Sequence, residues 1–201
     1  MVKNTFFNII GNAWPAVVIF MTVIILMRFM YLRQGKKKFV LHEELILLSF
    51  VVYILLLFEL VTIRDVEFGG TNWMPFKEIF RYDFGTKEFY KQVLGNILLF
   101  IPFGYFATYY SKLSKIRQIT FVTFITSSTI EVVQKFIGRS FDVDDILLNI
   151  TGGILGFLLF IGLDAIRKKL PKVFQNDIFY NILTCTAIIL VVLYFLGIVR
   201  I

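Results

Sequence analysis

Seven polar side chains of types that bind ligands lie in or beside stretches of sequence that are otherwise apolar. A carboxylate placed in an apolar medium costs several kcal/mol unless it is paired, protonated or hydrated. Glu131 is such a residue, and Lys135, four positions on, could pair with it. A structural hydrogen-bond network is therefore the alternative to a ligand pocket. The seven residues are Asn96, Glu131, Gln134, Arg139, Asp142, Asp145 and Asn149.

The spacing of these residues indicates that they converge. Glu131 and Gln134 are three residues apart and so share one face of a helix. At about 1.5 Å per residue, the polar groups of three helices fall within about 10 Å of the same helix ends. This predicts a polar pocket at one level, although Asp142 could serve only as an N-cap. A helix that begins near Asp142 carries on one face Asp142, Asp145, Asn149, Gly152 and Gly156.

Small and helix-breaking residues accompany this polar set. Gly152, Gly153 and Gly156 form a small-residue surface that permits close helix packing. Pro102 and Gly104 predict a kink or hinge within an apolar stretch. We therefore assign the three glycines to helix packing and the other two residues to a hinge.

The chain contains a single histidine, His42, and a single cysteine, Cys185. A tetrahedral zinc site or a Cys–His nucleophile pair therefore cannot be assembled. The carboxylates of Glu131, Asp142 and Asp145 could supply oxygen ligands for a divalent cation, but no bound cation is expected. The sequence predicts no cofactor.

Composition places these residues in a membrane protein. Of 201 residues, 58% are hydrophobic and 17% are charged, with a mean hydropathy of +0.78. These values exclude a cytosolic enzyme, a disulfide scaffold and a nucleic-acid binder. We expect an all-α polytopic bundle with about six transmembrane helices and one short interfacial helix. The expected spans are about 13–32, 44–63, 92–110, 118–137, 146–163 and 178–199.

Basic residues set the expected orientation in the cell membrane. Segments 33–38, 111–117 and 167–172 carry lysines and arginines without acids, which predicts that they are cytoplasmic. Both termini of this multi-pass protein are then extracellular. The external segment 64–91 is rich in aromatic residues, and three of its apolar residues are at helical spacing: Phe76, Ile79 and Phe80. It predicts either an amphipathic helix on the headgroups or an aromatic belt.

Three motifs resemble the VanZ-like membrane protein family. They are Trp73-Met74-Pro75-Phe76, the segment from Gly95-Asn96 to Pro102-Phe103-Gly104, and the ordered run from Glu131 to Gly156. The resemblance covers a five-span core at about 44–199, preceded by an additional span and basic loop at 1–43. It implies a role in tolerance to teicoplanin-type antibiotics in Gram-positive bacteria, without a transferable catalytic reaction. Asp144 has no assigned role.

The leading hypothesis is a non-enzymatic integral membrane protein that lowers susceptibility to lipoglycopeptides. Its outer-leaflet pocket would bind a lipid headgroup, the drug or a partner protein. Membrane lipids, including lipid II, are the expected partners, and nucleic acid is not. Two alternatives stay open: a metal-dependent enzyme acting on lipid-linked cell-wall precursors, and a small transporter or flippase.

Overall fold

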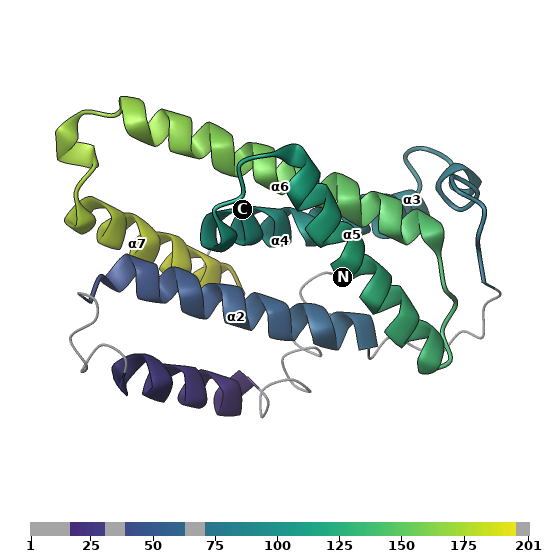
Figure 1. Cartoon of the computed structure of the whole chain (residues 1–201), viewed down its shortest axis with the longest axis horizontal. Coiled ribbons are helices and arrows are strands. Elements are labelled where there is room, and N and C mark those ends of the chain that lie inside the picture. Colours follow the sequence, from purple (N-terminus) through teal and green to yellow (C-terminus); the bar gives the residue numbers. More distant parts are fainter. Residues whose placement is uncertain (1–16, 31–38, 63–70, 196–201) are drawn as a thin grey trace. The chain divides into compact units, whose positions relative to one another are not determined.

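The protein is helical wherever the structure describes it. The computed structural model describes residues 17–30, 39–62 and 71–195, and within these ranges β-pairing is confined to an isolated bridge between Asn72 and Asp142. The all-α prediction is confirmed for this part of the chain. Two compact units are present, residues 1–60 with 167–201 and residues 61–166, and each is described by itself (Figure 1).

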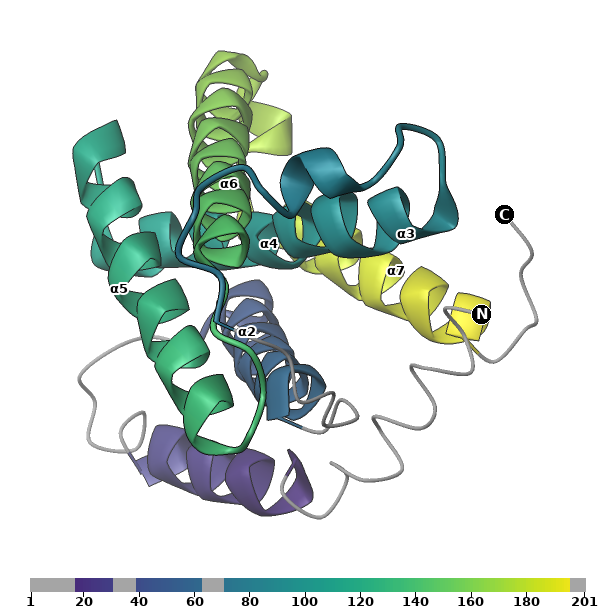
Figure 2. The same cartoon turned by 90° about the vertical axis from the view of Figure 1, so that its right-hand side faces the viewer.

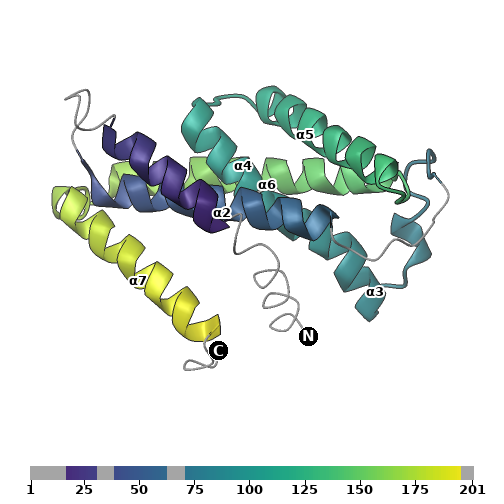
Figure 3. The same cartoon turned by 90° about the horizontal axis from the view of Figure 1, so that it is seen from below.

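Three long helices form the part of the first unit that the structure describes. They are the helix Val17–Met30, α2 (Leu41–Thr62) and α7 (Asp177–Phe195), with the short η3 (Lys172–Phe174) before α7. The Arg28 guanidinium makes a bidentate ion pair with Glu44, with Nε–Oε2 at 2.7 Å and Nη2–Oε1 at 2.8 Å. This pair connects Val17–Met30 to the first turn of α2 (Figure 3). Bidentate geometry makes it stronger and more directional than a simple ion pair.

The start of α2 also contacts α7. The backbone amide of His42 donates to Asn181 Oδ1 at 2.8 Å, and His42 Nδ1 lies 3.0 Å from the same oxygen. The rings of His42 and Tyr180 are tilted, with centroids 5.5 Å apart. Histidine in this unit is therefore a packing and hydrogen-bonding residue.

The second unit is built around three helices that follow the segment expected to be external, which the structure describes from residue 71 onward. Helices α4 and α5 both pack against α6 (Figures 1 and 2). Residues 87–111 are continuous helix, in which the π-helical turn η2 joins α3 to α4. The elements are η1 (Ile79–Arg81), α3 (Lys87–Phe89), η2 (Tyr90–Leu94), α4 (Gly95–Ser111), α5 (Ile116–Phe136) and α6 (Val143–Lys169).

Glycines permit the close approach of α4 to α6. A Cβ atom added to Gly152 would lie 2.2 Å from the carbonyl oxygen of Ile97, and one added to Gly156 would lie 2.1 Å from that of Ile101. The position of Gly104 is equally tight against the carbonyl of Gly153. Backbones that approach this closely leave no room for any side chain. Gly104 therefore lies in a helix contact, and a hinge role for it stays a prediction.

Among the described residues, four helices are long and apolar enough to cross a membrane: Leu41–Glu59, Lys87–Ser111, Val143–Lys169 and Asp177–Tyr194. Helix Val17–Met30 is shorter, and part of its expected span lies outside the described residues. Helix α5 has the expected bounds but lacks the required hydropathy, because its sequence contains several Ser and Thr residues besides Glu131 and Gln134. The structure thus supports a multi-pass helical protein with four composition-defined spans.

The amphipathic helix expected from Phe76, Ile79 and Phe80 is absent in that form. Turns occupy this region and end in the three-residue η1. Phe76 has φ +68°, a left-handed conformation that interrupts a regular helix. Helical spacing of apolar residues misled the prediction because tertiary contacts, described below, determine the local backbone.

Substituting alanine for glycine tests the packing of α6. We expect Gly152→Ala to destabilise the protein by about 1–3 kcal/mol, because the methyl group meets the α4 backbone. Thermal unfolding of the purified protein in detergent measures this. The matched control is Gly162→Ala on the same helix, which has open space around the added atom and should be neutral or slightly stabilising. Equal effects of the two substitutions would contradict the packing analysis.

Candidate functional site

A buried acid–amide–arginine chain connects the end of α5 to the loop that follows it. Glu131 is 1% exposed, and its Oε2 accepts a hydrogen bond from the backbone amide of Asp142 at 2.9 Å. With the Gln134 amide oriented to suit its neighbours, Gln134 donates to Glu131 Oε1 at 2.9 Å and accepts from Arg139 Nη1 at 2.7 Å. Both carboxylate oxygens of Glu131 therefore meet amide donors, which offset its desolvation.

Lys135, which the sequence offered as an alternative ion-pair partner of Glu131, contacts an aromatic ring instead. Its Nζ lies 5.6 Å from the centroid of the Trp73 ring, in a cation–π arrangement. Trp73 in turn packs on Phe141, with ring centroids 4.6 Å apart. The lysine thus contacts the external segment, and amides satisfy the glutamate.

A glycine turn returns Arg139 to α5. Gly138 has φ +90°, and its amide donates to the carbonyl of Lys135 at 3.2 Å. The amide of Arg139 then donates to the carbonyl of Gln134 at 2.9 Å. Positive φ at the end of a helix is typical of glycine, since it lacks a Cβ. The turn places the Arg139 guanidinium beside the Gln134 side chain.

Asp142 caps α6 and also anchors the external segment. Its Oδ1 accepts from the amide of Asp144 at 2.8 Å and from Asn72 Nδ2 at 2.9 Å. The amide of Asn72 donates to the carbonyl of Phe141 at 2.8 Å, and the amide of Val143 donates to that of Asn72 at 3.2 Å. Burial raises the pKa of the Asp142 carboxyl, although these hydrogen bonds oppose the change. The N-cap geometry that the sequence left open is present.

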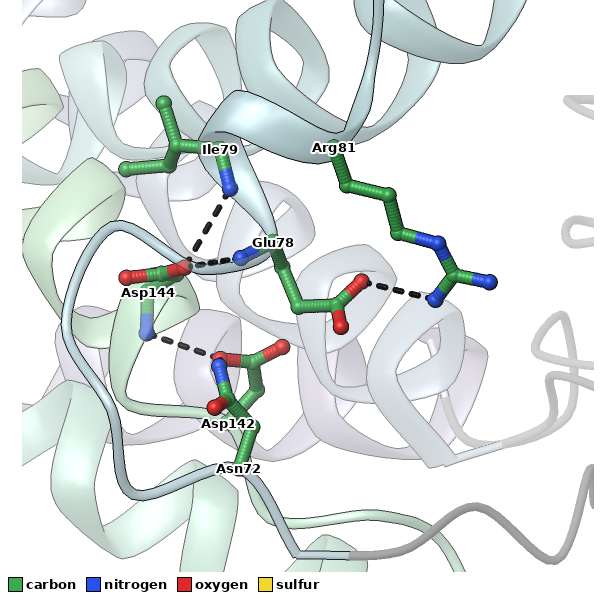
Figure 4. A network of polar contacts seen from close by, with 6 residues as sticks. All are labelled: Asn72, Glu78, Ile79, Arg81, Asp142 and Asp144. Atoms are coloured by element: carbon green, nitrogen blue, oxygen red, sulfur yellow. Dashed lines mark hydrogen bonds and ion pairs between the residues drawn. The ribbon is translucent and has the colours of Figure 1, made fainter.

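Asp144 is a buried carboxylate that binds three backbone amides, and the sequence assigned it no role. It is 1% exposed, and it accepts hydrogen bonds from the amides of Glu78 (2.7 Å) and Ile79 (3.2 Å) (Figure 4). The amide of Phe76 also donates to it. Three amides that point at one carboxylate form an anion-binding nest. The strained φ of Phe76 costs about 1–3 kcal/mol. Hydrogen bonds to a charged group, each contributing about 1.5–3 kcal/mol, offset it.

Two of the expected residues form a separate pair, and a third bonds elsewhere. Asn96 Nδ2 donates to Asp145 Oδ1 and so connects α4 to α6. Asn149 Nδ2 donates to Ser127 Oγ at 2.8 Å, between α6 and α5. The structure thus unites Glu131, Gln134, Arg139 and Asp142 in one network, with Asn96–Asp145 and Asn149–Ser127 as neighbouring pairs.

Tyr82 is a further member of this polar region that the sequence did not indicate. Burial raises the pKa of its hydroxyl, and the negative charges of Glu78, Asp145 and Asp142 raise it further, against the opposing effect of Arg81. Its phenol therefore shares a neighbourhood with carboxylates from both the external segment and α6. Asn72 was also missed. A single asparagine in a loop carries no sequence signal, because its role depends on the bridge to Asp142.

The carboxylates do not gather as metal ligands. Within the described ranges, no three His, Cys, Asp or Glu side chains are arranged to hold a metal ion. Glu131, Asp142 and Asp145 instead each accept from amide groups. The half-exposed members of the polar region, which could contact an external molecule, are Tyr82, Asn96, Arg139, Asp142 and Asp145.

Comparison with known proteins gives one family match. The model of the VanZ/LLP1 family matches residues 16–167. This range includes the helix Val17–Met30 and ends within α6, whereas the sequence placed a core at 44–199 after an additional span. That division into 1–43 and 44–199 stays a prediction. Neither the curated proteins nor the solved structures yield a match.

The amide nest around Asp144 can be tested by one substitution. We expect Asp144→Asn to release residues 72–79, because a neutral amide replaces the charge and offers one acceptor oxygen instead of two. The local free energy of opening should fall by about 2–4 kcal/mol. Amide hydrogen exchange of this segment, followed by mass spectrometry, measures the change. Asp83→Asn, at an exposed acid of the same segment, is the control and should exchange like the wild type.

Proposed function

Because the chain belongs to the VanZ/LLP1 family, we propose that it is a non-enzymatic membrane protein that lowers bacterial susceptibility to teicoplanin-type lipoglycopeptides. The observation that supports this proposal is the buried Glu131–Gln134–Arg139 chain, which lies next to a segment that Asp142 and Asp144 hold by hydrogen bonds. Such an arrangement is preorganised, since its polar groups are already oriented by partners. It therefore presents Arg139 in a fixed position at the surface of the second unit.

Buried and half-exposed members of the polar region would have different tasks. Glu131, Gln134 and Asn149 are buried and act as supports for their neighbours. Arg139 and Asp145 are half-exposed and could contact a lipid headgroup, the drug or a partner protein. A guanidinium suits phosphate or carboxylate groups, which both lipid-linked precursors and glycopeptides carry. Proposed binding is thus concentrated on the half-exposed residues.

We further propose six crossings with both termini and the polar region outside. Helix α5 is the candidate for a crossing in addition to the four composition-defined spans. It buries polar residues and exposes apolar ones, the reverse of a helix on the surface of a soluble protein. Thr123, Ser127, Glu131 and Gln134 are buried. The exposed residues of the same helix include Phe121, Phe124, Ile125, Val132 and Phe136. The basic segments 111–117 and 167–172 support a cytoplasmic location for the opposite ends of the helices.

No contact among the described residues specifically favours the two alternatives. A metal-dependent enzyme would need converging oxygen ligands, and the three candidate carboxylates instead bond to amides. A hinge-driven transporter would need freedom at Gly104, which lies against the backbone of Gly153. The non-enzymatic role is therefore the function that the geometry supports best.

Susceptibility to teicoplanin tests the proposal. In a Gram-positive host that expresses the protein, we expect Glu131→Gln to lower the minimum inhibitory concentration to that of the host without it. In Glu131→Gln, the side-chain oxygen of residue 131 is still needed by the Asp142 amide, so its nitrogen faces the side-chain nitrogen of Gln134. Gln134 can then no longer both donate to residue 131 and accept from Arg139. Asp145→Asn should act in the same direction by removing a charge from the half-exposed surface.

The control for these variants is Glu88→Gln, at an exposed acid of α3. It changes the same functional group outside the network and should leave susceptibility as in the wild type. Membrane levels of all variants are compared by immunoblot. Unchanged susceptibility of Glu131→Gln and Asp145→Asn at equal protein levels would exclude the polar region as the origin of resistance.

A further inference from the structure

The external segment exposes large apolar side chains that its own backbone holds in place. Trp73 is 64% exposed and Phe80 is 82% exposed, and Met74 and Phe76 are also exposed. A flexible loop could fold such side chains inward. Here the Asp144 carboxylate fixes the amides of Phe76 and Ile79, so the backbone cannot rearrange to cover them. These rings therefore form a rigid, outward-facing apolar surface.

Lysines accompany the rings on this surface. Lys77 is exposed between Phe76 and Phe80, and Lys135 lies over the Trp73 ring. Exposed aromatic side chains beside lysines are characteristic of the boundary between acyl chains and headgroups. The rings suit the acyl-chain side of this boundary, and the ammonium groups suit the phosphates.

The same surface continues onto α5. Lys135 connects Trp73 to the last turn of α5, where Phe136 is 87% exposed. The exposed apolar face of α5 extends from this turn through Val132 and Ile125. Trp73 therefore lies beside the last turn of the exposed apolar face of α5. If α5 crosses the membrane as proposed above, this position corresponds to the headgroup level.

We propose that Trp73, Phe76, Lys77, Phe80 and Lys135 form an interfacial platform that binds anionic phospholipid at the outer surface of the bilayer. The platform rests on the topology proposed above, in which α5 crosses the membrane. Its occupant is bulk phospholipid of the surrounding leaflet. The platform thereby sets the height of the polar region, including Arg139, relative to the headgroups.

Fluorescence quenching of Trp73 tests the platform in the full chain. The protein contains two tryptophans, so Trp14→Phe leaves Trp73 as the reporter. The protein is placed in nanodiscs that contain equal mole fractions of phosphatidylglycerol and phosphatidylcholine, with bromine on the chains of one lipid or the other. We expect brominated phosphatidylglycerol to quench Trp73 more strongly, with an association preference of about fivefold for each of the two lysines, the size expected for a lysine at an anionic surface.

Removing the two lysines should abolish this preference. In the Lys77→Gln/Lys135→Gln variant, the two brominated lipids should quench Trp73 equally. The matched control is Lys112→Gln. Lys112 also lies over an aromatic ring, with its Nζ 5.1 Å from the centroid of Tyr109, but it follows the C-terminal end of α4 and is not part of the platform. It should keep the preference. Circular dichroism checks that every variant retains its helix content.

Several results would overturn the platform. Equal quenching by both lipids in the unsubstituted lysine background would show no preference for anionic headgroups. Undiminished quenching by aqueous acrylamide, with none by either lipid, would place Trp73 away from the bilayer. A preference that survives loss of both lysines would assign it to other residues. Because the measurement involves no antibiotic, each of these failures is distinct from failure of the proposed resistance function.

Discussion

The buried carboxylate of Asp144 is the interaction on which the rest of the polar region depends. It gathers the backbone amides of Phe76, Glu78 and Ile79, and so fixes the external segment to the first turn of α6. Asp142, two residues earlier, holds Asn72 of the same segment and caps the helix. An ionised group in this position is costly without partners, and backbone amides satisfy it without introducing a second charge.

The same solution recurs at Glu131, which binds an amide of the chain and an amide side chain rather than a base. Amide partners stabilise the carboxylate and also fix its orientation. An amide N–H is held in the plane of its group, whereas the N–H groups of a lysine ammonium can rotate. Lys135 is thereby released to contact Trp73. The network therefore joins α5, the connecting turn and α6 into one arrangement, with Arg139 at its surface end.

Much of this arrangement could be predicted from residue types and spacing. Apolar stretches located the helices, and Glu131 beside Gln134 within such a stretch indicated a polar region. Asp144 and Asn72 could not be predicted, because their partners are backbone amides and a loop bridge that exist only once the chain is folded. The helix expected at Phe76–Phe80 failed for the same reason, since the Asp144 nest overrides the local periodicity. The spacing of residues predicts which of them share a face of a regular helix or strand. It does not predict contacts to an irregular segment such as residues 72–79.

Helix α5 shows why hydropathy and function conflict in this chain. Its polar residues lower its mean hydropathy below that of a spanning helix, yet they lie on the face that meets α6. Thr123 packs against Gly153, which has no side chain and so leaves space for the polar face of α5, and Ser127 accepts a hydrogen bond from the Asn149 side chain. The exposed face keeps large apolar residues such as Phe121 and Phe136. A helix that carries a buried polar site has its polar face inside and its apolar face outside, and its average composition then conceals the exposed apolar surface.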